Sequence, residues 1–569
     1  MRALSAFSLR HSAFVSPPTP YSTLLTFLRY ARTMSEVPVL RLDASLVQPA
    51  DWLTLLPAWL SRVLPEFLPH QRWFAGKGRE LHQVTVADVA LLTIPHSNHD
   101  MNHAWPWYAL ALVRVTYQED VVEHYLLPVG LDREAPAETA TLAVLRPAVA
   151  AAPTGATAPP AHPYLFEATA DGRFLKALLT AMWTGTDLRS TLGRVVFTMS
   201  GDVKAEVAAV CDDGAARAPG AEQSNSSALF LAADGQPRFF LKLFRKLEPG
   251  VNPEAEVLRF LGDFPHVPRL AATAAYEGVT EAALAVVQRF VASQGDGWQY
   301  TLAALTANPQ DATDERPQRL LQELAQLGHR TAQLHRALAA RPEVDDFAPL
   351  PITAQDTAGW QAEIRELARS VGRELAAAAA GLPAAMRPNA LAVAVRLEGE
   401  LPGLEALSAL VRAVEKIRIH GDFHLGQVLK TADDWVIFDF EGEPVRPLAF
   451  RRSRFCALRD VAGMLRSFSY ATHVAGRNAK PTHPAGASAA WLRAWEQSAR
   501  DAFWNAYQTE ADNDNAMAAN LLPSQAGERA AVLACFELEK AIYELRYELR
   551  NRPDWLTIPL AAVERLLQG

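Results

Sequence analysis

The chain has 569 residues, of which 49% are hydrophobic and 21% are charged, and its formal net charge is −8. This balance is typical of a globular protein of about two to four domains and excludes a disordered or fibrous chain. The acidic charge argues against nucleic acid as a partner, and without a run of about 18 apolar residues no membrane-spanning helix is expected. Three widely separated cysteines predict neither disulfides nor a zinc site and fit a reducing, cytoplasmic location.

Residues 1–36 are predicted to be an extension outside the fold. The first 33 contain four arginines and several serines but no acidic residue, a composition that resembles an organelle transit peptide. The alternative, which we favour, is a start codon placed too far upstream, with Met34 as the true start. In either case we expect the segment to be poorly ordered.

Residues 37–145 are predicted to form a first, mixed domain. Apolar residues at helical spacing predict a helix over 52–68, and strand-like runs follow at 84–93, 107–117 and 121–129. Between the helix and the first strand, the adjacent aromatics Trp73 and Phe74 lie among three cations. This segment either closes a core or forms an exposed cationic patch for phosphates, and we favour the structural role.

An Ala- and Pro-rich loop or linker, residues 146–163, separates the first domain from a small β-rich unit over 164–295. That unit is expected to contain, in chain order, strands at 194–199 and 203–210, a hairpin of 228–232 with 238–244, a helix at 254–261 and a strand at 283–291. Residues 296–569 read as a large helical unit with a short β insertion at 416–439.

The strongest signal for function lies in two loops that carry aspartates. Asp422 and Gln427 lie just after one short apolar run, and Asp439 follows a second. Loops that leave strands often carry binding and catalytic side chains. Asp422 is suited to orient a hydroxyl or accept its proton, while Gln427 and Asp439 offer oxygen ligands for Mg²⁺ on ATP phosphates. The alternative is a turn between strands whose acids are solvated.

These loops carry a resemblance to a known family. His420-Gly421-Asp422, followed five residues later by an amide and then by a strand and Asp439, resembles the signature of aminoglycoside-phosphotransferase-like kinases. Most of those kinases have asparagine where this chain has Gln427. Together with the runs 439–444 and 458–468, that glutamine makes the chain from residue 55 to its end similar to bacterial maltokinases.

The resemblance implies an α+β protein with a bilobal, protein-kinase-like (aminoglycoside phosphotransferase-like) fold behind an N-terminal cap domain. Residues 37–145 would be the cap, and the segment 71–79 resembles part of it. Residues 164–295 would be the β-rich, ATP-binding lobe. Residues 296–569 would be the helical lobe that carries the catalytic and sugar-binding groups.

The ATP-binding residues are sought around the predicted hairpin. A lysine in an apolar strand is a poor core residue but a good phosphate ligand, so Lys242 resembles the β3 lysine of kinases. Glu256 is the preferred partner for this lysine, and Glu254 is the alternative. No glycine-rich loop precedes Lys242; the polar residues Ser224, Asn225 and Ser226 take that place and are expected to cover phosphates, the alternative being a solvated turn. At the hinge after the last strand, the backbone around Gln288 would meet adenine.

The acceptor site is predicted on a helix near the C-terminus. Glu537, Lys540, Tyr543, Tyr547 and Asn551 recur at helical spacing and therefore share one face. Lys540, Tyr543 and Tyr547 are expected to bind a sugar, because maltokinases line their disaccharide pocket with the corresponding helix. The alternative is an amphipathic surface helix with charge pairs. From the loops, His424 and Arg446 are weaker substrate candidates.

The resemblance implies transfer of a phosphoryl group from ATP, with Mg²⁺, to maltose, giving maltose 1-phosphate for α-glucan (glycogen) synthesis from trehalose. It also suggests a partnership with trehalose synthase. Two other functions stay open. One is a kinase for another sugar such as glucosamine, which would share every ATP-side residue. The other is a catalytically silent kinase-like domain that regulates a partner, against which the presence of Lys242, Asp422 and Asp439 argues.

Overall fold

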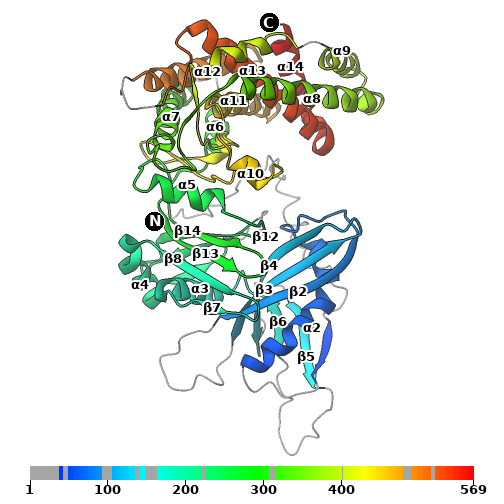
Figure 1. The fold of residues 1–569 in the computed structure, drawn as a ribbon, viewed down its shortest axis with the longest axis vertical. Coiled ribbons are helices and arrows are strands. Elements are labelled where there is room, and N and C mark those ends of the chain that lie inside the picture. Colours follow the sequence, from blue (N-terminus) through cyan, green and yellow to red (C-terminus); the bar gives the residue numbers. More distant parts are fainter. Residues whose placement is uncertain are drawn as a thin grey trace, which may run out of the picture. The chain divides into compact units, whose positions relative to one another are not determined.

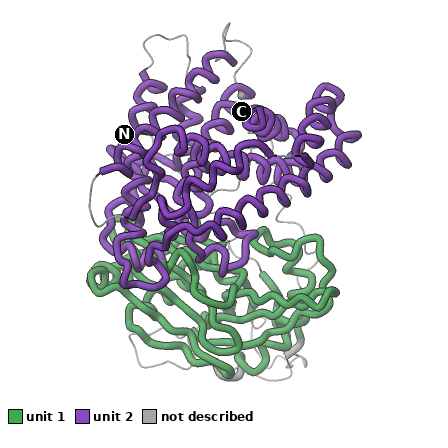
Figure 2. The backbone as a smooth tube through the Cα atoms, turned by 45° about the horizontal axis from the view of Figure 1, so that its top comes forward, with its two compact units in different colours: residues 1–256, 269–290 green, residues 257–268, 291–569 purple. Residues whose placement is uncertain are grey.

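The computed structural model describes residues 38–42, 49–92, 106–134, 141–147, 163–219, 225–306, 315–399, 401–478, 489–513 and 519–568. The predicted extension, nearly all of the Ala- and Pro-rich linker and Ser224 lie outside the described residues. The chain divides into two compact units, which are coloured separately in Figure 2. Unit 1 comprises residues 1–256 and 269–290, and unit 2 comprises residues 257–268 and 291–569.

The first sheet of unit 1 is built from the N-terminal strands. Helix α2 (Pro49–Phe67) packs against β2, as Figure 1 shows. The strand order is β1-β5-β6-β4-β3-β2, with β12 also paired to β4. The strands are β1 (Val39–Leu42), β2 (Leu81–Leu92), β3 (Trp107–Tyr117), β4 (Val122–Asp132), β5 (Thr141–Pro147), β6 (Tyr164–Glu167) and β12 (Lys246–Leu247).

The second sheet of unit 1 has the order β7-β8-β13-β14-β11-β10-β9. Its strands are β7 (Leu188–Arg189), β8 (Arg194–Met199), β9 (Ala215–Arg217), β10 (Ser226–Leu231), β11 (Pro237–Leu243), β13 (Leu270–Glu277) and β14 (Ala282–Arg289). The predicted hairpin is confirmed as β10 and β11, which pair antiparallel with Ser227 opposite Lys242. Helix α3 (Gly172–Thr184) packs against strands of this sheet, and α4 (Lys204–Asp213) packs against α3. Helix α5 (Pro253–Leu261) follows β12 in the chain and begins in unit 1.

The two sheets share a hydrophobic core. In β3 the side chains alternate, so that Trp107, Ala109 and Ala111 join the cluster under α2, whereas Tyr108 and Leu110 join a cluster that also contains α3 and the second sheet. A strand buried on both faces joins the two sheets into one unit. A domain boundary before residue 164 is therefore misplaced, since β6 lies within the first sheet, between β5 and β4.

One predicted strand is wrong. Residues 204–213 form helix α4 after a 3₁₀ turn, not a strand at 203–210. The apolar residues Val203, Val207 and Val210 are spaced by four and three, and all three are buried. This spacing is that of a helix. The short apolar run 203–210 was interpreted as a strand because so few residues do not separate the two patterns clearly.

Unit 2 is mainly helical, as predicted. Its longer helices are α6 (Gly297–Leu305), α7 (Arg316–Leu338), α8 (Ala354–Ala378), α9 (Arg387–Glu398), α11 (Leu458–Asn478), α12 (Ala489–Ala511), α13 (Ala526–Asn551) and α14 (Thr557–Gln568). Helix α13 packs against α8, α11 and α14 (Figure 1). The predicted β insertion contains β17 (Val428–Lys430), paired with β18 (Trp435–Ile437). Among the described residues, no helix is both long and apolar enough to cross a bilayer.

Candidate active site

In unit 1, Lys242 belongs to a buried polar triad on β11, α5 and β14. Its Nζ lies 2.8 Å from Glu254 Oε2, and the Gln288 amide donates to Glu254 Oε1 at 2.7 Å. All three residues are buried, Glu254 to 2% exposure. A charged pair with this little solvent requires close contact, because separating the two buried ions is costly.

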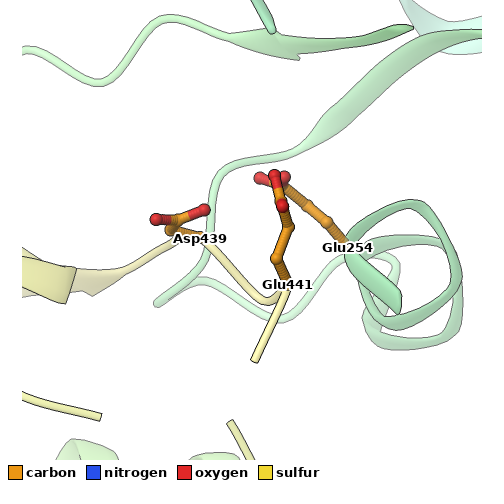
Figure 3. A group of neighbouring side chains, drawn as sticks. All are labelled: Glu254, Asp439 and Glu441. Carbon is orange, nitrogen blue, oxygen red and sulfur yellow. The ribbon is translucent and has the colours of Figure 1, made fainter. Parts of the chain in front are cut away.

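The preference for Glu256 as the partner of Lys242 was wrong, since the structure uses the alternative, Glu254. Helix α5 begins at Pro253, so Glu254 lies in its first turn, where a carboxylate is favoured by the helix dipole (Figure 3). Two residues along a helix rotate the side chain by about 200°, which turns Glu256 away from the direction of Glu254.

The side chains of two predicted nucleotide residues point inward. Ser226 is 3% exposed, and its hydroxyl accepts a hydrogen bond from Arg245 Nε at 2.7 Å. The side chain of Gln288 is engaged with Glu254, so only its backbone remains as a hinge group, as the prediction allowed. Asn225 lies directly before β10. The hydroxyl of Ser226 is therefore a structural anchor and not a group presented to phosphates.

In unit 2, Asp460 of α11 anchors the predicted catalytic loop. Its carboxylate accepts hydrogen bonds from the backbone N–H of His420 at 2.7 Å and of Gly421 at 2.9 Å. The ring of the fully buried His335, on α7, lies 3.1 Å from the same carboxylate. Gly421 has φ +82°, a conformation that side chains disfavour, so glycine is required at this turn.

Asp422 follows this anchored turn and lies near two basic groups. Its Oδ1 is 3.4 Å from Lys540 Nζ on α13, and its Oδ2 is 3.8 Å from His424 Nε2. Burial alone would raise the pKa of Asp422, but the nearby Lys540, with His424 and His420, outweighs it and lowers that pKa below the usual range. The carboxylate is therefore ionised near neutral pH and able to accept a proton.

His424 is held as a neutral ring beside Asp422. Burial is the main cause that lowers its pKa to about 4, and the charge of Lys540 acts in the same direction. The Gly426 N–H donates to His424 Nδ1 at 3.0 Å, so the ring proton is on Nε2, the nitrogen nearest Asp422. The nearest carboxylate oxygen of Asp422 is 3.8 Å from His424 Nε2, beyond hydrogen-bond distance, and a substrate contact by His424 stays a prediction.

Oxygen atoms suited to a divalent cation lie on the two predicted loops. Gln427 is 4% exposed, and its Oε1 has no hydrogen-bond partner among the described residues. Asp439 adopts φ +69°, a strained backbone for a non-glycine residue. Its carboxylate oxygen lies within 4.8 Å of one from Glu441, and Figure 3 shows both side chains on the segment after β18. A buried, unsatisfied amide oxygen and these carboxylates fit Mg²⁺, which prefers oxygen ligands.

A cavity of about 90 Å³ in unit 2 brings together four predicted residues, Asp422, Arg446, Lys540 and Tyr543. Tyr547 is not among its lining residues and is 37% exposed, with Arg552 over its ring. Tyr547 therefore lies outside this cavity, and its contact with a sugar stays a prediction. Tyr547 lies one turn beyond Tyr543, and the shared helix face continues past the end of the cavity. His424 does not line the cavity either.

Five further charged residues line this cavity and were not predicted as site residues: Glu443, Arg451, Arg459, Asp460 and Glu539. Glu443 lies 3.3 Å from Arg446 Nε and hydrogen-bonds Tyr543. Burial, followed by Glu443, raises the pKa of Tyr543, so its phenol stays protonated and can donate. A signal for Glu443 was present, because it lies in the acidic run just after Asp439.

The maltokinase N-terminal cap domain matches residues 67–171, and the phosphotransferase enzyme family matches residues 215–443. The cap match extends past β6, in agreement with its place in the first sheet. Two relatives are named glucosamine kinase, from Streptacidiphilus jiangxiensis (30% identical over 328 residues) and from Mycolicibacterium smegmatis (29% over 287 residues). The alignments cover 56% and 50% of this chain and 66% and 63% of those relatives, less than two thirds of each.

Solved structures support the fold. A glucosamine kinase in complex with glucosamine, ADP and inorganic phosphate is 22% identical, covers 87% of this chain and 96% of its own, and has a TM-score of 0.54. Crystal form A of a glucosamine kinase gives 22% identity, 91% and 98% coverage and a TM-score of 0.57. The chain therefore has a maltokinase-type cap followed by a phosphotransferase domain, and the predicted fold class is confirmed.

Proposed function

We propose that this phosphotransferase, which carries a maltokinase-type cap, transfers the γ-phosphoryl group of ATP to the anomeric hydroxyl of maltose. The products are ADP and maltose 1-phosphate. The observation that carries the proposal is an ionised Asp422 in a cavity shared with Lys540, Tyr543, Glu443 and Arg446. Such a set offers both donors and acceptors for sugar hydroxyls, together with a carboxylate that can act as a base.

In this reaction Asp422 orients the attacking hydroxyl and accepts its proton as the oxygen–phosphorus bond forms. Lys540 holds Asp422 ionised before the reaction and stabilises charge near it. Gln427 and Asp439, with Glu441 close by, would hold Mg²⁺, which neutralises charge on the phosphates. Lys242, fixed by Glu254, would bind phosphate oxygens. Positioning and electrostatics supply most of the rate enhancement in such transfers.

The same proposal places the product in the synthesis of α-glucan (glycogen), with the maltose unit coming from trehalose. A trehalose synthase is then the expected functional partner, because it supplies the acceptor. This assignment rests on the maltokinase-type cap and on the sequence resemblance.

Glucosamine is the second candidate acceptor, favoured by one observation. The relatives and solved structures described above are glucosamine kinases. The cavity offers Glu443 and Glu539 as carboxylates for an ammonium group. However, each of them already lies 3.3 Å from an arginine, Arg446 and Arg459 respectively, which weakens its attraction for a second cation.

The test is an acceptor panel with the full chain. Maltose, glucosamine, glucose and no sugar are incubated with ATP and Mg²⁺, ADP release is followed, and the phosphorylated position is read by ³¹P NMR. We expect a kcat/KM for maltose at least about tenfold above the others, with phosphate on the anomeric carbon. Preference for glucosamine would overturn the assignment of maltose as the acceptor but would leave the assignment as a sugar kinase intact. Absence of sugar-dependent turnover would favour a silent regulatory domain.

A further inference from the structure

We propose that Arg245 is a positioning residue that couples the cap to the ATP-binding hairpin, so that the cap controls nucleotide affinity. The inference rests on the proposed function in one respect, namely that Lys242 and the residues around Ser226 meet the phosphates of ATP. It gives the cap, and in particular the Trp73-Phe74 segment, a role in positioning the ATP-binding hairpin. The proposed reaction itself does not involve that segment.

The first observation is the set of partners around Arg245. The residue is 0% exposed, and its guanidinium donates to Ser226 Oγ (2.7 Å), Glu167 Oε1 (2.8 Å) and Thr169 Oγ1 (2.5 Å). Glu167 ends β6 of the first sheet, whereas Ser226 begins β10 of the second. One rigid, planar group therefore joins the cap to the first residue of the hairpin.

The second observation concerns the aromatic segment of the cap. Trp73 lies under the Arg245 guanidinium, 4.7 Å from ring centroid to Cζ, and is 2% exposed. The ring centroid of Trp73 lies 6.1 Å from that of Tyr125 on β4, and the ring centroid of Phe74 lies 5.1 Å from that of the same tyrosine. The segment is thus buried and structural, as favoured from sequence, and it forms a face of the Arg245 site by cation–π stacking.

The third observation is that the strand carrying Lys242 leaves one sheet for the other at Arg245. Lys242 is on β11, and three residues later the Arg245 carbonyl accepts from Leu126 N at 2.8 Å in the cap sheet. The next residues form β12, which pairs with β4. Ser226 lies opposite Leu243, and Ser227 opposite Lys242. Arg245 therefore fixes both strands of the hairpin at the end where Lys242 lies.

Stability alone is a weak reason for this arrangement. A buried ion pair contributes little net stability compared with apolar residues of similar size, because both ions lose their hydration. It does impose geometry, since Nε of the guanidinium donates to Ser226 while Nη2 donates to both Glu167 and Thr169, each in a direction set by the planar group. What the site fixes is the position of Ser226 beside Lys242.

The test compares Arg245→Lys with a matched control, Tyr276→Phe. Lysine keeps the charge near Glu167 but cannot donate to Ser226 and Thr169 with the same planar fork. Tyr276 is 1% exposed, and its hydroxyl donates to Asp88 Oδ2 at 2.6 Å, another buried link between the two sheets, but it involves neither Ser226 nor β11. The measurements are KM for ATP and for maltose, ATP binding by calorimetry without acceptor, and Tm.

We expect Arg245→Lys to raise the KM and Kd for ATP on the order of tenfold, while the KM for maltose changes less than about twofold. Tyr276→Phe should lower Tm and leave ATP affinity unchanged. If Arg245→Lys does not fold, Trp73→Leu, which removes the stacking face of Arg245 together with the ring contact to Tyr125, should raise the KM for ATP several-fold. Unchanged ATP affinity in the folded variant, or an equal loss in the control, overturns the coupling.

Failure of the proposed function has a different signature. A wild-type chain that binds ATP but phosphorylates no sugar refutes the sugar kinase, yet the calorimetric comparison of Arg245→Lys with Tyr276→Phe still decides the coupling. A wild-type chain that binds no ATP overturns both.

Discussion

The Lys242 triad of unit 1 and the Asp422 cavity of unit 2 show two ways of arranging buried charge. In the triad, a lysine and an amide each donate to the same glutamate, at 2.8 Å and 2.7 Å, and all three residues are buried. In the cavity, Asp422 lies 3.4 Å and 3.8 Å from its basic neighbours and keeps 23% of its side chain exposed. The triad is a fixed support, whereas the cavity keeps its charges available to a ligand.

This difference has a physical consequence for substitution. Removing one partner of a buried ion pair leaves the other charge without that partner. The main effect is that the remaining side chain loses its position. Removing a group from the open cavity takes away an interaction with the ligand and leaves the protein nearly intact. The predictions below use this contrast, starting with the largest effect.

Asp422→Asn should lower kcat by about 10²- to 10⁴-fold, because an amide cannot accept the proton of the attacking hydroxyl. Tm should change little, since the anchor of the loop is Asp460 and not Asp422. The measurement is ADP release at saturating maltose. Turnover close to that of the wild type would remove Asp422 from the role of base.

Asp439→Ala should lower kcat by at least about 100-fold, and Gln427→Ala should lower it less, because a carboxylate attracts Mg²⁺ more strongly than a neutral amide. Excess Mg²⁺ should partly restore the Gln427 variant. Activity is measured across a Mg²⁺ titration, with Asp433→Ala, an exposed acid of the neighbouring turn, as the control. Identical Mg²⁺ dependence in the wild type and both variants would place the metal elsewhere.

Glu254→Gln should lower kcat/KM for ATP by about 10- to 100-fold, because Lys242 loses the charge that holds it in position. Glu256→Gln is the matched control on the same helix turn and should change kcat/KM for ATP less than about threefold. Steady-state kinetics with varied ATP separate the two. A larger effect at Glu256 would mean that the pairing changes when nucleotide binds.

Lys540→Met should shift the acid limb of the pH profile of kcat/KM to higher pH. Asp422 has a lowered pKa, so it is active as a base above that pKa and fails as the pH falls through it. Without Lys540, burial is the main remaining influence and raises this pKa, so activity is lost at a higher pH. Lys540→Arg, which keeps the charge, should leave the limb in place; an unmoved limb in both variants contradicts the electrostatic role.

The site features that the sequence marks are local ones. The loop of Asp422 was found because Gly421 and the spacing to Gln427 and Asp439 lie within 20 residues, and Lys242 because a lysine is unusual in an apolar strand. Where the prediction failed, the deciding information was geometric. Glu254 and Glu256 differ only in where helix α5 begins, and helix ends are the least certain feature of a sequence pattern.

Residues that act across the fold were missed altogether. Asp460 binds a loop 40 residues away, His335 lies 125 residues from Asp460, and Arg245 contacts Glu167 across 78 residues. No local pattern marks such residues, because their partners are brought together only by the topology of the sheets and helices. A buried arginine after an apolar strand is, in one sequence, indistinguishable from an exposed one.

The smallest expected effect concerns how far the sugar site extends along α13. Helical spacing placed Tyr543 and Tyr547 on one face, but only Tyr543 lines the cavity with Asp422. Tyr543→Ala should raise the KM for maltose several-fold, corresponding to about 1 kcal/mol for a lost contact, with kcat nearly unchanged, because a contact made equally in the ground and transition states affects only binding. Tyr547→Ala should change neither constant by more than about twofold.

Kinetics with varied maltose at saturating ATP measure the KM and kcat of both variants. Tyr543→Phe separates the contribution of the hydroxyl that meets Glu443 from that of the ring. If Tyr547→Ala raised the KM for maltose as much as Tyr543→Ala does, the bound sugar would extend beyond this cavity. The turn of α13 that carries Tyr547 would then bind the acceptor as the turn of Tyr543 does.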